Sequence, residues 1–140
     1  MASERQIFVD ANVFVALLNK DDALHERATA LWSRLKEEGA VIVTTNMVVS
    51  EVITVISQRA GKALAMEFAQ TVYGGGDDFV VVYSDAAVEG RALEYFRAIR
   101  SKNVSFVDAI ILATMERMDI RRLASFDHIF RRQKGIELFA

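Results

Sequence analysis

Residues 7–12 of this 140-residue chain are Ile-Phe-Val-Asp-Ala-Asn, a short apolar run that ends at a carboxylate. β-Branched and aromatic residues favour strands, and a run without polar alternation is typical of a strand buried on both faces of a parallel sheet. Similar runs follow at residues 41–43, 79–82 and 137–139, and residues 122–124 (Arg-Leu-Ala) form an apparent short strand. The opening stretch therefore predicts a buried strand with Asp10 at its carboxyl end.

Helical patterns separate these runs. Apolar residues recur at three- and four-residue spacing in segments 24–38, 46–59, 61–73, 85–100 and 105–118. We expect N-caps at Asn46, Asp85 and Ser105, and a helix end at Gly39. Strands that alternate with helices indicate an α/β fold. We predict a single domain over residues 1–140, a three-layer α/β/α sandwich with a central parallel sheet of four to five strands.

Composition excludes several classes of protein. The chain has no cysteine, so disulfides and thiolate metal sites are impossible, which fits a reducing cytoplasm. A membrane span needs about 18 apolar residues in a row, and no such run occurs. Because Glu4 and Arg5 precede the first apolar run and Asp10 interrupts it, no secretory signal is visible. We expect a soluble protein without a membrane partner.

Three core-like windows each carry one acidic residue and no basic one. Residues 6–19, 40–58 and 103–115 together contain only Asp10, Glu51 and Asp108, although a charged fraction of 26% predicts about 12 charges in 46 residues. An isolated carboxylate among apolar neighbours is costly unless it is paired. Since these windows offer no Lys or Arg, Mg²⁺ or Mn²⁺ is the natural partner of oxygen-only ligands.

The positions of the acids suggest that they converge. Asp10 directly follows the first strand, and Asp127 follows the short strand at 122–124. Glu51 and Asp108 lie in the first two turns of their helices. In an open parallel sheet, sites form at the carboxyl ends of the strands. Four carboxylates are therefore expected at one edge of the sheet.

Each acid also has a purely structural interpretation. Asp108 stands three residues after Ser105, which is the spacing of a capping box, and Asp10 could cap the helix that follows it. Glu51 could lie on an exposed helix face. Asp127 could have a plain surface or cap role, paired with a nearby arginine (Arg122, Arg131 or Arg132). The sequence leaves these alternatives open.

Four motifs carry a family resemblance. Residues 7–12, then Ser50-Glu51-Val52, then residues 106–109 (Phe-Val-Asp-Ala) and 123–127 (Leu-Ala-Ser-Phe-Asp) resemble the PIN domain, specifically the VapC-like toxin ribonucleases. The resemblance implies a metal-dependent endoribonuclease whose acidic metal-binding set is Asp10, Glu51, Asp108 and Asp127. It also implies that Asn12 and Ser125 are small polar residues that orient the carboxylates or a metal-bound water. At the position of Asn12, many relatives have Ser or Thr. It further implies a homodimer and a cognate antitoxin.

Basic residues are concentrated late in the chain. Residues 91–134 hold 10 basic and 5 acidic side chains, whereas residues 1–90 hold 7 and 13. Such a half could present a basic face to a polyanion or could form ordinary solvated helix faces. With the resemblance in view, the residues expected to hold RNA phosphates are Arg117, Arg121, Arg122, Arg131 and Arg132.

Other functions compete with this interpretation. His25 and His128 could support a metal-free acid–base ribonuclease. An aspartyl phosphatase would want a second Asp two residues after Asp10, where this chain has Asn12. A receiver domain would need an acidic pair after a strand, and Asp21 and Asp22 follow none. A PIN domain without activity, which only binds RNA or a protein, is the main alternative.

Overall fold

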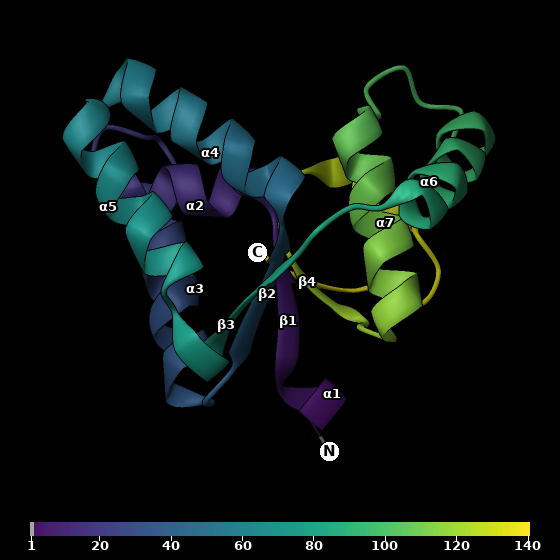
Figure 1. Cartoon of the computed structure of the whole chain (residues 1–140), viewed down its shortest axis with the longest axis horizontal. Coiled ribbons are helices and arrows are strands. Elements are labelled where there is room, and N and C mark those ends of the chain that lie inside the picture. The colour runs from purple at the N-terminus through teal and green to yellow at the C-terminus, as the bar shows by residue number, and fades with distance from the viewer. Residues whose placement is uncertain (1) are drawn as a thin grey trace.

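The protein forms one five-stranded sheet. The computed structural model describes residues 2–140, with side chains from residue 4 onward. Every strand pairing is parallel, and the strand order is β3-β2-β1-β4-β5 (Figure 1). The strands are β1 (Gln6–Val9), β2 (Val41–Thr45), β3 (Phe79–Val82), β4 (Arg122–Ala124) and β5 (Glu137–Phe139). The predicted parallel α/β sheet is confirmed.

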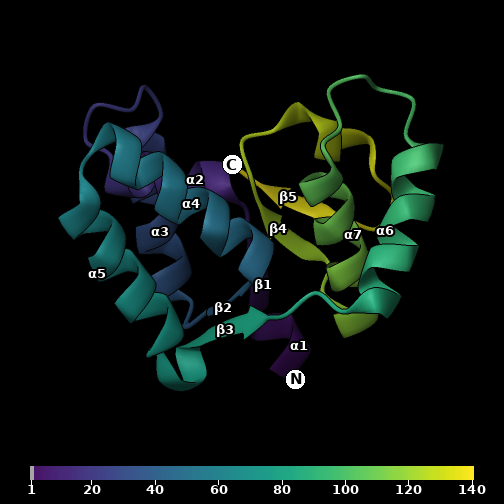
Figure 2. The same cartoon turned by 45° about the horizontal axis from the view of Figure 1, so that its top comes forward.

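Helices cover both faces of the sheet, as Figures 1 and 2 show. One side carries α2 (Ala11–Leu18), α3 (His25–Glu37), α4 (Asn46–Arg59) and α5 (Lys62–Tyr73), and the other carries α6 (Ala86–Ala98) and α7 (Phe106–Met118). The short elements are α1 (Ala2–Arg5) and the 3₁₀ turns η1 (Gly76–Asp78) and η2 (His128–Arg132). The predicted three-layer sandwich is confirmed. Within residues 2–140, no helix has the length and apolar character needed to cross a bilayer.

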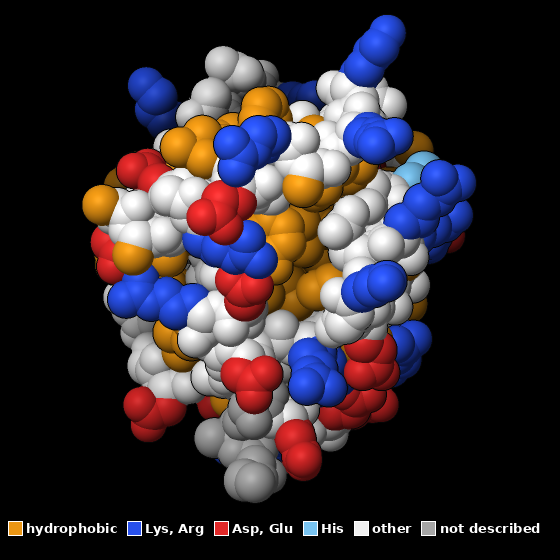
Figure 3. All heavy atoms as spheres, turned by 90° about the vertical axis from the view of Figure 1, so that its right-hand side faces the viewer, with side chains coloured by type: hydrophobic (Ala, Val, Ile, Leu, Met, Phe, Trp, Pro, Cys, Tyr) orange, Lys and Arg blue, Asp and Glu red, His pale blue; other side chains and the backbone are white. Residues whose placement is uncertain are grey.

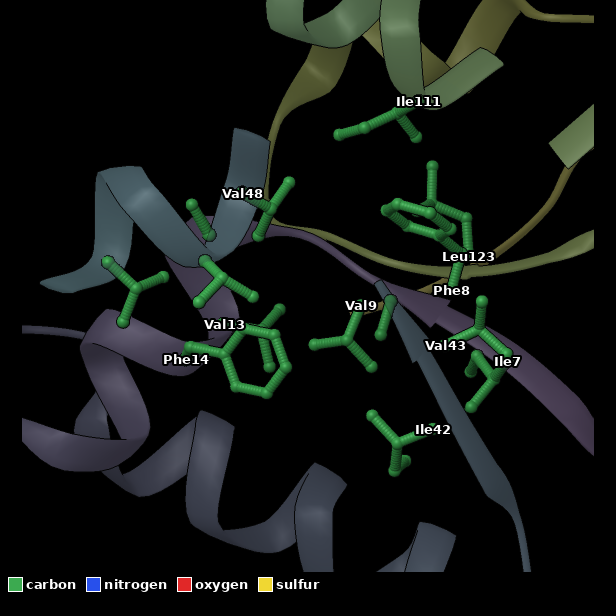
Figure 4. Packing of buried hydrophobic residues seen from close by; sticks show 14 of the residues in the cluster. Ile7, Phe8, Val9, Val13, Phe14, Ile42, Val43, Val48, Ile111 and Leu123 are labelled. Carbon is green, nitrogen blue, oxygen red and sulfur yellow. The ribbon is translucent and has the colours of Figure 1, made fainter. Parts of the chain in front are cut away.

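The core is built around the central strand. Phe8 is fully buried and packs in one cluster with Leu123 of β4 and Ile111 of α7 (Figure 4). Burial of such a side chain stabilises the fold by about 1.5–3 kcal/mol. Residues 79–82 are only half-buried, because β3 is an edge strand. The other edge strand, β5, is likewise exposed at Glu137 and half-buried at Leu138 and Phe139. The expectation that every apolar run is buried on both faces is therefore wrong for β3 and β5.

Two of the three predicted N-caps are confirmed. The Asp85 side chain accepts a hydrogen bond from the Val88 N–H, and Ser105 caps α7. The prediction for Asn46 is wrong, because Thr45 occupies the cap position and Asn46 is the first helical residue. The Asn46 side chain instead accepts a hydrogen bond from the Ser84 N–H at 3.0 Å, so it fixes the connection between β3 and α6.

The chain order sets the place of the site. After β1, the chain adds β2 and β3 on one side of it, and then crosses to add β4 and β5 on the other. The strand order therefore reverses at β1. In such sheets, the loops at the carboxyl ends of the strands diverge at the reversal and leave a crevice there. Asp10 and Asp127 follow the two strands that border this point.

Candidate functional site

Asp10 is a buried carboxylate at the end of β1, with 5% of its surface exposed. Its Oδ1 accepts a hydrogen bond from the Ala11 N–H at 2.7 Å, so it caps α2. Its Oδ2 accepts one from the Ser125 hydroxyl at 2.7 Å. Burial raises the pKa of Asp10 to about 7, the charges of Asp108 and Glu51 contribute to the rise, and the two hydrogen bonds oppose it.

Ser125 and Asn12 tie the segment after β4 to the segment after β1. The Ser125 oxygen also accepts hydrogen bonds from the Asp127 N–H at 3.1 Å and from Asn12 Nδ2 at 3.3 Å. The Asn12 Oδ1 accepts one from the Phe126 N–H at 3.0 Å. The structure thus brings both sequence-predicted polar residues to Asp10, where an amide and a hydroxyl determine its orientation.

Asp108 enters from the first turn of α7. Its Oδ2 accepts a hydrogen bond from the Ser105 N–H at 2.9 Å, and its own N–H donates to Ser105 Oγ at 3.0 Å. The carboxylate is buried, with 7% of the residue exposed. Burial raises the pKa of Asp108, and the charge of Asp127 adds to this effect.

Asp127 and Glu51 lie at the more open side of the crevice. Asp127 is half-buried, and its Oδ1 accepts a hydrogen bond from the Ile129 N–H at 3.0 Å at the start of η2. Glu51 lies on an exposed position of α4. Desolvation by its surroundings and the charge of Asp108 raise the pKa of Glu51. The exposed-face alternative for Glu51 is therefore confirmed, although its carboxylate senses the cluster.

The capping alternatives are also confirmed, and they leave the acids chemically available. Asp10, Asp108 and Asp127 each cap a helical element. Among the described residues, Asp108 and Asp127 each use one oxygen in this way and keep the other free of hydrogen bonds. Capping thus holds each carboxylate in place without consuming it.

These four residues, Asp10, Glu51, Asp108 and Asp127, form what we call the acidic cluster. Their charges act on one another, because Asp108 raises the pKa of Asp10 and Glu51, and Asp127 raises that of Asp108. Within the described chain, no ion pair involves any of the four, so the alternative in which Asp127 pairs with an arginine is not what the structure shows. When these carboxylates are ionised, no side chain of the described residues neutralises them, and the raised pKa values of Asp10, Glu51 and Asp108 express this cost.

The spacing of the cluster is looser than that of a preformed ion cage. Across residues 2–140, no three Asp, Glu or His side chains lie close enough to hold one ion. Asp10 and Asp108 are fixed by hydrogen bonds, whereas Glu51 is exposed and makes no hydrogen bond in this part of the chain.

The five sequence-predicted arginines are dispersed. Arg131 and Arg132 lie on η2, directly after Asp127. Arg117 forms an ion pair with Asp85 at 2.7 Å, and it stands nine residues, or about 13 Å, beyond Asp108 on α7. Arg122 pairs with Glu38 at 2.8 Å at the amino end of the sheet. Arg121 is exposed beside it.

The two histidines play different parts. His25 Nδ1 lies 2.7 Å from the Ala16 carbonyl oxygen, so it joins the start of α3 to α2. His128 is exposed next to Asp127. Because the His25 ring is occupied by the Ala16 carbonyl, and no hydrogen bond among the described residues joins it to His128 or to an acid of the crevice, nothing here favours an acid–base histidine pair.

The sequence placed Arg100 in the basic half without selecting it for RNA contacts, and the structure shows that it follows α6 and lines the same groove as Asp127. No periodicity connects residue 100 with η2, because the contact arises only when α6 and α7 pack together. The excess of basic residues in 91–134 was the available signal. It marked the region but could not separate Arg100 from its paired neighbours.

The chain is an α/β/α protein with a parallel sheet and with carboxylates outside any described ion pair where the strand order reverses. It belongs to the PIN domain family. The family's sequence model matches residues 7–136. The chain is 31% identical over 136 residues to the 23S rRNA-specific endonuclease VapC20 of Mycobacterium tuberculosis, covering 94% of this chain and 97% of that protein.

Solved structures agree with this assignment. The crystal structure of Mycobacterium tuberculosis VapC20, a sarcin-ricin loop cleaving toxin, aligns with a TM-score of 0.78 and 31% identity over 89% of this chain and 92% of that one. A toxin-antitoxin complex from Klebsiella pneumoniae aligns with a TM-score of 0.64 at 15% identity, over 94% and 95% of the two chains. VapBC2 from Rickettsia felis gives 0.66 at 14% identity, over 96% and 97%. The last two show the fold alone.

Proposed function

We propose that this PIN domain is an endoribonuclease that hydrolyses RNA phosphodiester bonds with Mg²⁺ or Mn²⁺, and that it is the toxin of a toxin–antitoxin pair. The observation that carries the proposal is the acidic cluster. Two of its carboxylates are buried, all four are coupled by charge, and none is in an ion pair within the described residues. Buried charges of one sign need a counter-ion.

The chemistry of the cluster fits a hard divalent cation. All four side chains offer carboxylate oxygens, which Mg²⁺ and Mn²⁺ prefer. Asp10 and Asp108 would hold the ion from the buried side, and Glu51 and Asp127 from the open side. A bound divalent ion neutralises a phosphodiester, activates water for attack and stabilises the departing oxygen.

The protein residues prepare the site for this chemistry. Ser125 donates to Asp10 Oδ2 and so favours the ionised form of a carboxylate whose burial favours the protonated one. Asn12 fixes Phe126, which aligns the loop that carries Ser125 and Asp127. Arg131 and Arg132 extend the same edge with positive charge, and we assign them to contacts with RNA phosphates.

Substrate and partners follow from the relatives. Since VapC20 is named for its action on 23S rRNA, we take structured ribosomal RNA as the first substrate to test. The toxin-antitoxin neighbours support a cognate antitoxin as protein partner. We also propose a homodimer, because the large apolar side chains of Leu93 and Phe96 are exposed on α6. Cellular RNA as substrate would place the enzyme in the cytoplasm.

Cleavage of a ribosomal RNA fragment tests the proposal. We expect the parent protein to cut the RNA with Mg²⁺ or Mn²⁺ and to lose activity in EDTA. Asp10→Asn and Asp108→Asn should each reduce the rate at least a hundredfold. Asp119→Asn is the matched control, because Asp119 is exposed at the opposite end of α7 in a left-handed conformation that Asn tolerates.

Two results would overturn this assignment. Cleavage that persists in EDTA would remove the metal from the mechanism. A folded parent protein that binds Mn²⁺ and RNA but cuts no RNA would favour the inactive PIN module that only binds its partners.

A further inference from the structure

A groove runs away from the acidic cluster along the face that carries α6. It has a volume of about 740 Å³ and lies between the carboxyl end of α6 with the residues after it and the η2 segment. Asp127 and His128 stand at its wall, so the groove is continuous with the cluster. In Figure 3, this side of the molecule shows hydrophobic side chains in a hollow whose border carries Lys and Arg side chains together with some Asp and Glu side chains.

The lining combines apolar and cationic side chains. Ile99 and Ile129 supply the apolar surface from opposite walls. Arg100 and Arg132 stand on the same two walls, and both are exposed. An apolar surface with a cation on each wall complements a single nucleic-acid strand, which has negative phosphates and flat bases.

Arg100 and Arg132 differ from several other arginines of residues 91–134 in that no carboxylate of the described chain pairs with them. Arg91, Arg117 and Arg122 are neutralised by carboxylates at 2.8, 2.7 and 2.8 Å. Neither Arg100 nor Arg132 joins an ion pair in the part of the chain that the structure describes. The positive charges of Arg100, just after α6, and of Arg132, on η2, are thus available along the groove that leads to the acidic cluster.

A second, smaller hollow adjoins the groove. Tyr95 and Gln133 line the groove and also line this hollow of about 240 Å³. Arg121 and Lys134 lie at that far hollow. Glu116 and Asp119 line the far hollow as well, so acids balance its cations, and the uncompensated positive charge lies in the groove beside Asp127.

We propose that this groove binds the unpaired RNA strand on one side of the scissile phosphate, with Arg100 and Arg132 contacting backbone phosphates and Ile99 and Ile129 contacting bases. This inference rests on the proposed function, since it assumes that RNA is the substrate. It assigns strand positioning to Arg100, which neither the family motifs nor the acidic cluster includes.

Equilibrium binding of an uncleavable RNA tests the groove. The probe is a fluorescent 12-nucleotide 2′-O-methyl RNA without secondary structure, and its anisotropy gives Kd in EDTA at several salt concentrations. We expect Arg100→Gln/Arg132→Gln to raise Kd at least tenfold. The slope of log K against log salt should fall by about 1.4, because each phosphate contact on a single strand contributes about 0.7.

A control with the same loss of charge isolates the groove. Arg59→Gln/Lys62→Gln removes two exposed, unpaired cations of the described chain at the turn between α4 and α5. We expect this variant to bind the RNA within twofold of the parent. Circular dichroism and thermal melting confirm that both variants are folded, which surface substitutions permit.

The outcomes separate the groove from the nuclease activity. Equal affinity of the groove variant and the control variant would overturn the inference, even if the parent cleaves RNA in a parallel Mn²⁺ assay. If the parent cleaves no RNA while the groove variant alone loses affinity, the proposed nuclease function fails and the groove stands as an RNA-binding site. Binding of an antitoxin that is lost in the groove variant, with RNA affinity unchanged, would assign the groove to the protein partner and overturn the inference.

Discussion

At the scale of single residues, the charge of Asp10 is unfavourable because its carboxylate is buried. The pKa of about 7 means that Asp10 ionises near neutral pH. Its hydrogen bonds come from Ala11, Ser125 and Asn12, which are all neutral donors. A carboxylate in this setting is poorly compensated until a cation arrives.

Without divalent cations, Asp10 should make stability fall as pH rises. Its folded-state pKa of about 7 lies above its unfolded value of about 3.9, so the unfolded state binds fewer protons between these limits. The free energy of unfolding then decreases from about pH 4 to pH 7. Asp10→Asn should flatten this slope in urea titrations performed in EDTA. An unchanged slope would show that Asp10 ionises normally.

Ser125 should influence activity through the pKa of Asp10. Removal of its hydroxyl in Ser125→Ala takes away a hydrogen bond that lowers this pKa. The acid limb of the profile of kcat/KM against pH should move to higher pH, with a loss of roughly fivefold to tenfold at pH 7 and partial recovery at pH 9. Ser57→Ala, on the exposed face of α4, is the control. A uniform loss at all pH values would instead indicate a structural role.

At the scale of elements, helix starts do two jobs in this protein. The same turn of α7 that is capped by Ser105 presents Asp108, and the same turn of η2 that Asp127 caps borders the groove. Local sequence rules that fix a helix boundary therefore also fix the direction of a functional carboxylate.

The α7 capping box should contribute measurably to stability. Ser105→Ala removes the acceptor for the Asp108 N–H and should lower the free energy of unfolding by about 1 kcal/mol. Urea denaturation measures the difference. Ser33→Ala, at an exposed position of α3, should stay within about 0.5 kcal/mol of the parent. If Ser105→Ala lowered the free energy of unfolding no more than Ser33→Ala does, the cap would be dispensable.

Local sequence patterns predicted the elements well and their contacts less well. The helix at 46–59 begins and ends as predicted, whereas the helix expected at 85–100 stops at Ala98 because Ile99 is extended. Asn46 was misassigned because its partner, Ser84, lies 38 residues away. Apolar runs identify strands, but only the sheet order reveals that β3 is an edge.

The same limit applies to the site. The positions of Asp10 and Asp108 were predictable because charge is so rare around them. The hydrogen bond between Ser125 and Asp10 spans 115 residues and depends on β1 and β4 being neighbours. Which arginines are free was not predictable, since Arg117 and Arg122 find acids on distant elements.

At the scale of the whole molecule, topology converts distant segments into one site. The acidic cluster comes from the ends of β1 and β4 and the starts of α4 and α7, which meet where the strand order reverses. The fold thus gathers charges that repel one another, and it leaves their compensation to a ligand.

Binding of Mn²⁺ by the intact protein at pH 8 tests this dependence on a bound cation most directly, because it does not require knowledge of the RNA. We predict that isothermal titration calorimetry detects one or two ions per chain, and that Asp10→Asn and Asp108→Asn each weaken binding at least tenfold while Asp119→Asn leaves it unchanged. Equal Mn²⁺ affinity in the parent and in the Asp10→Asn and Asp108→Asn variants, or no binding by the folded parent, would contradict the account.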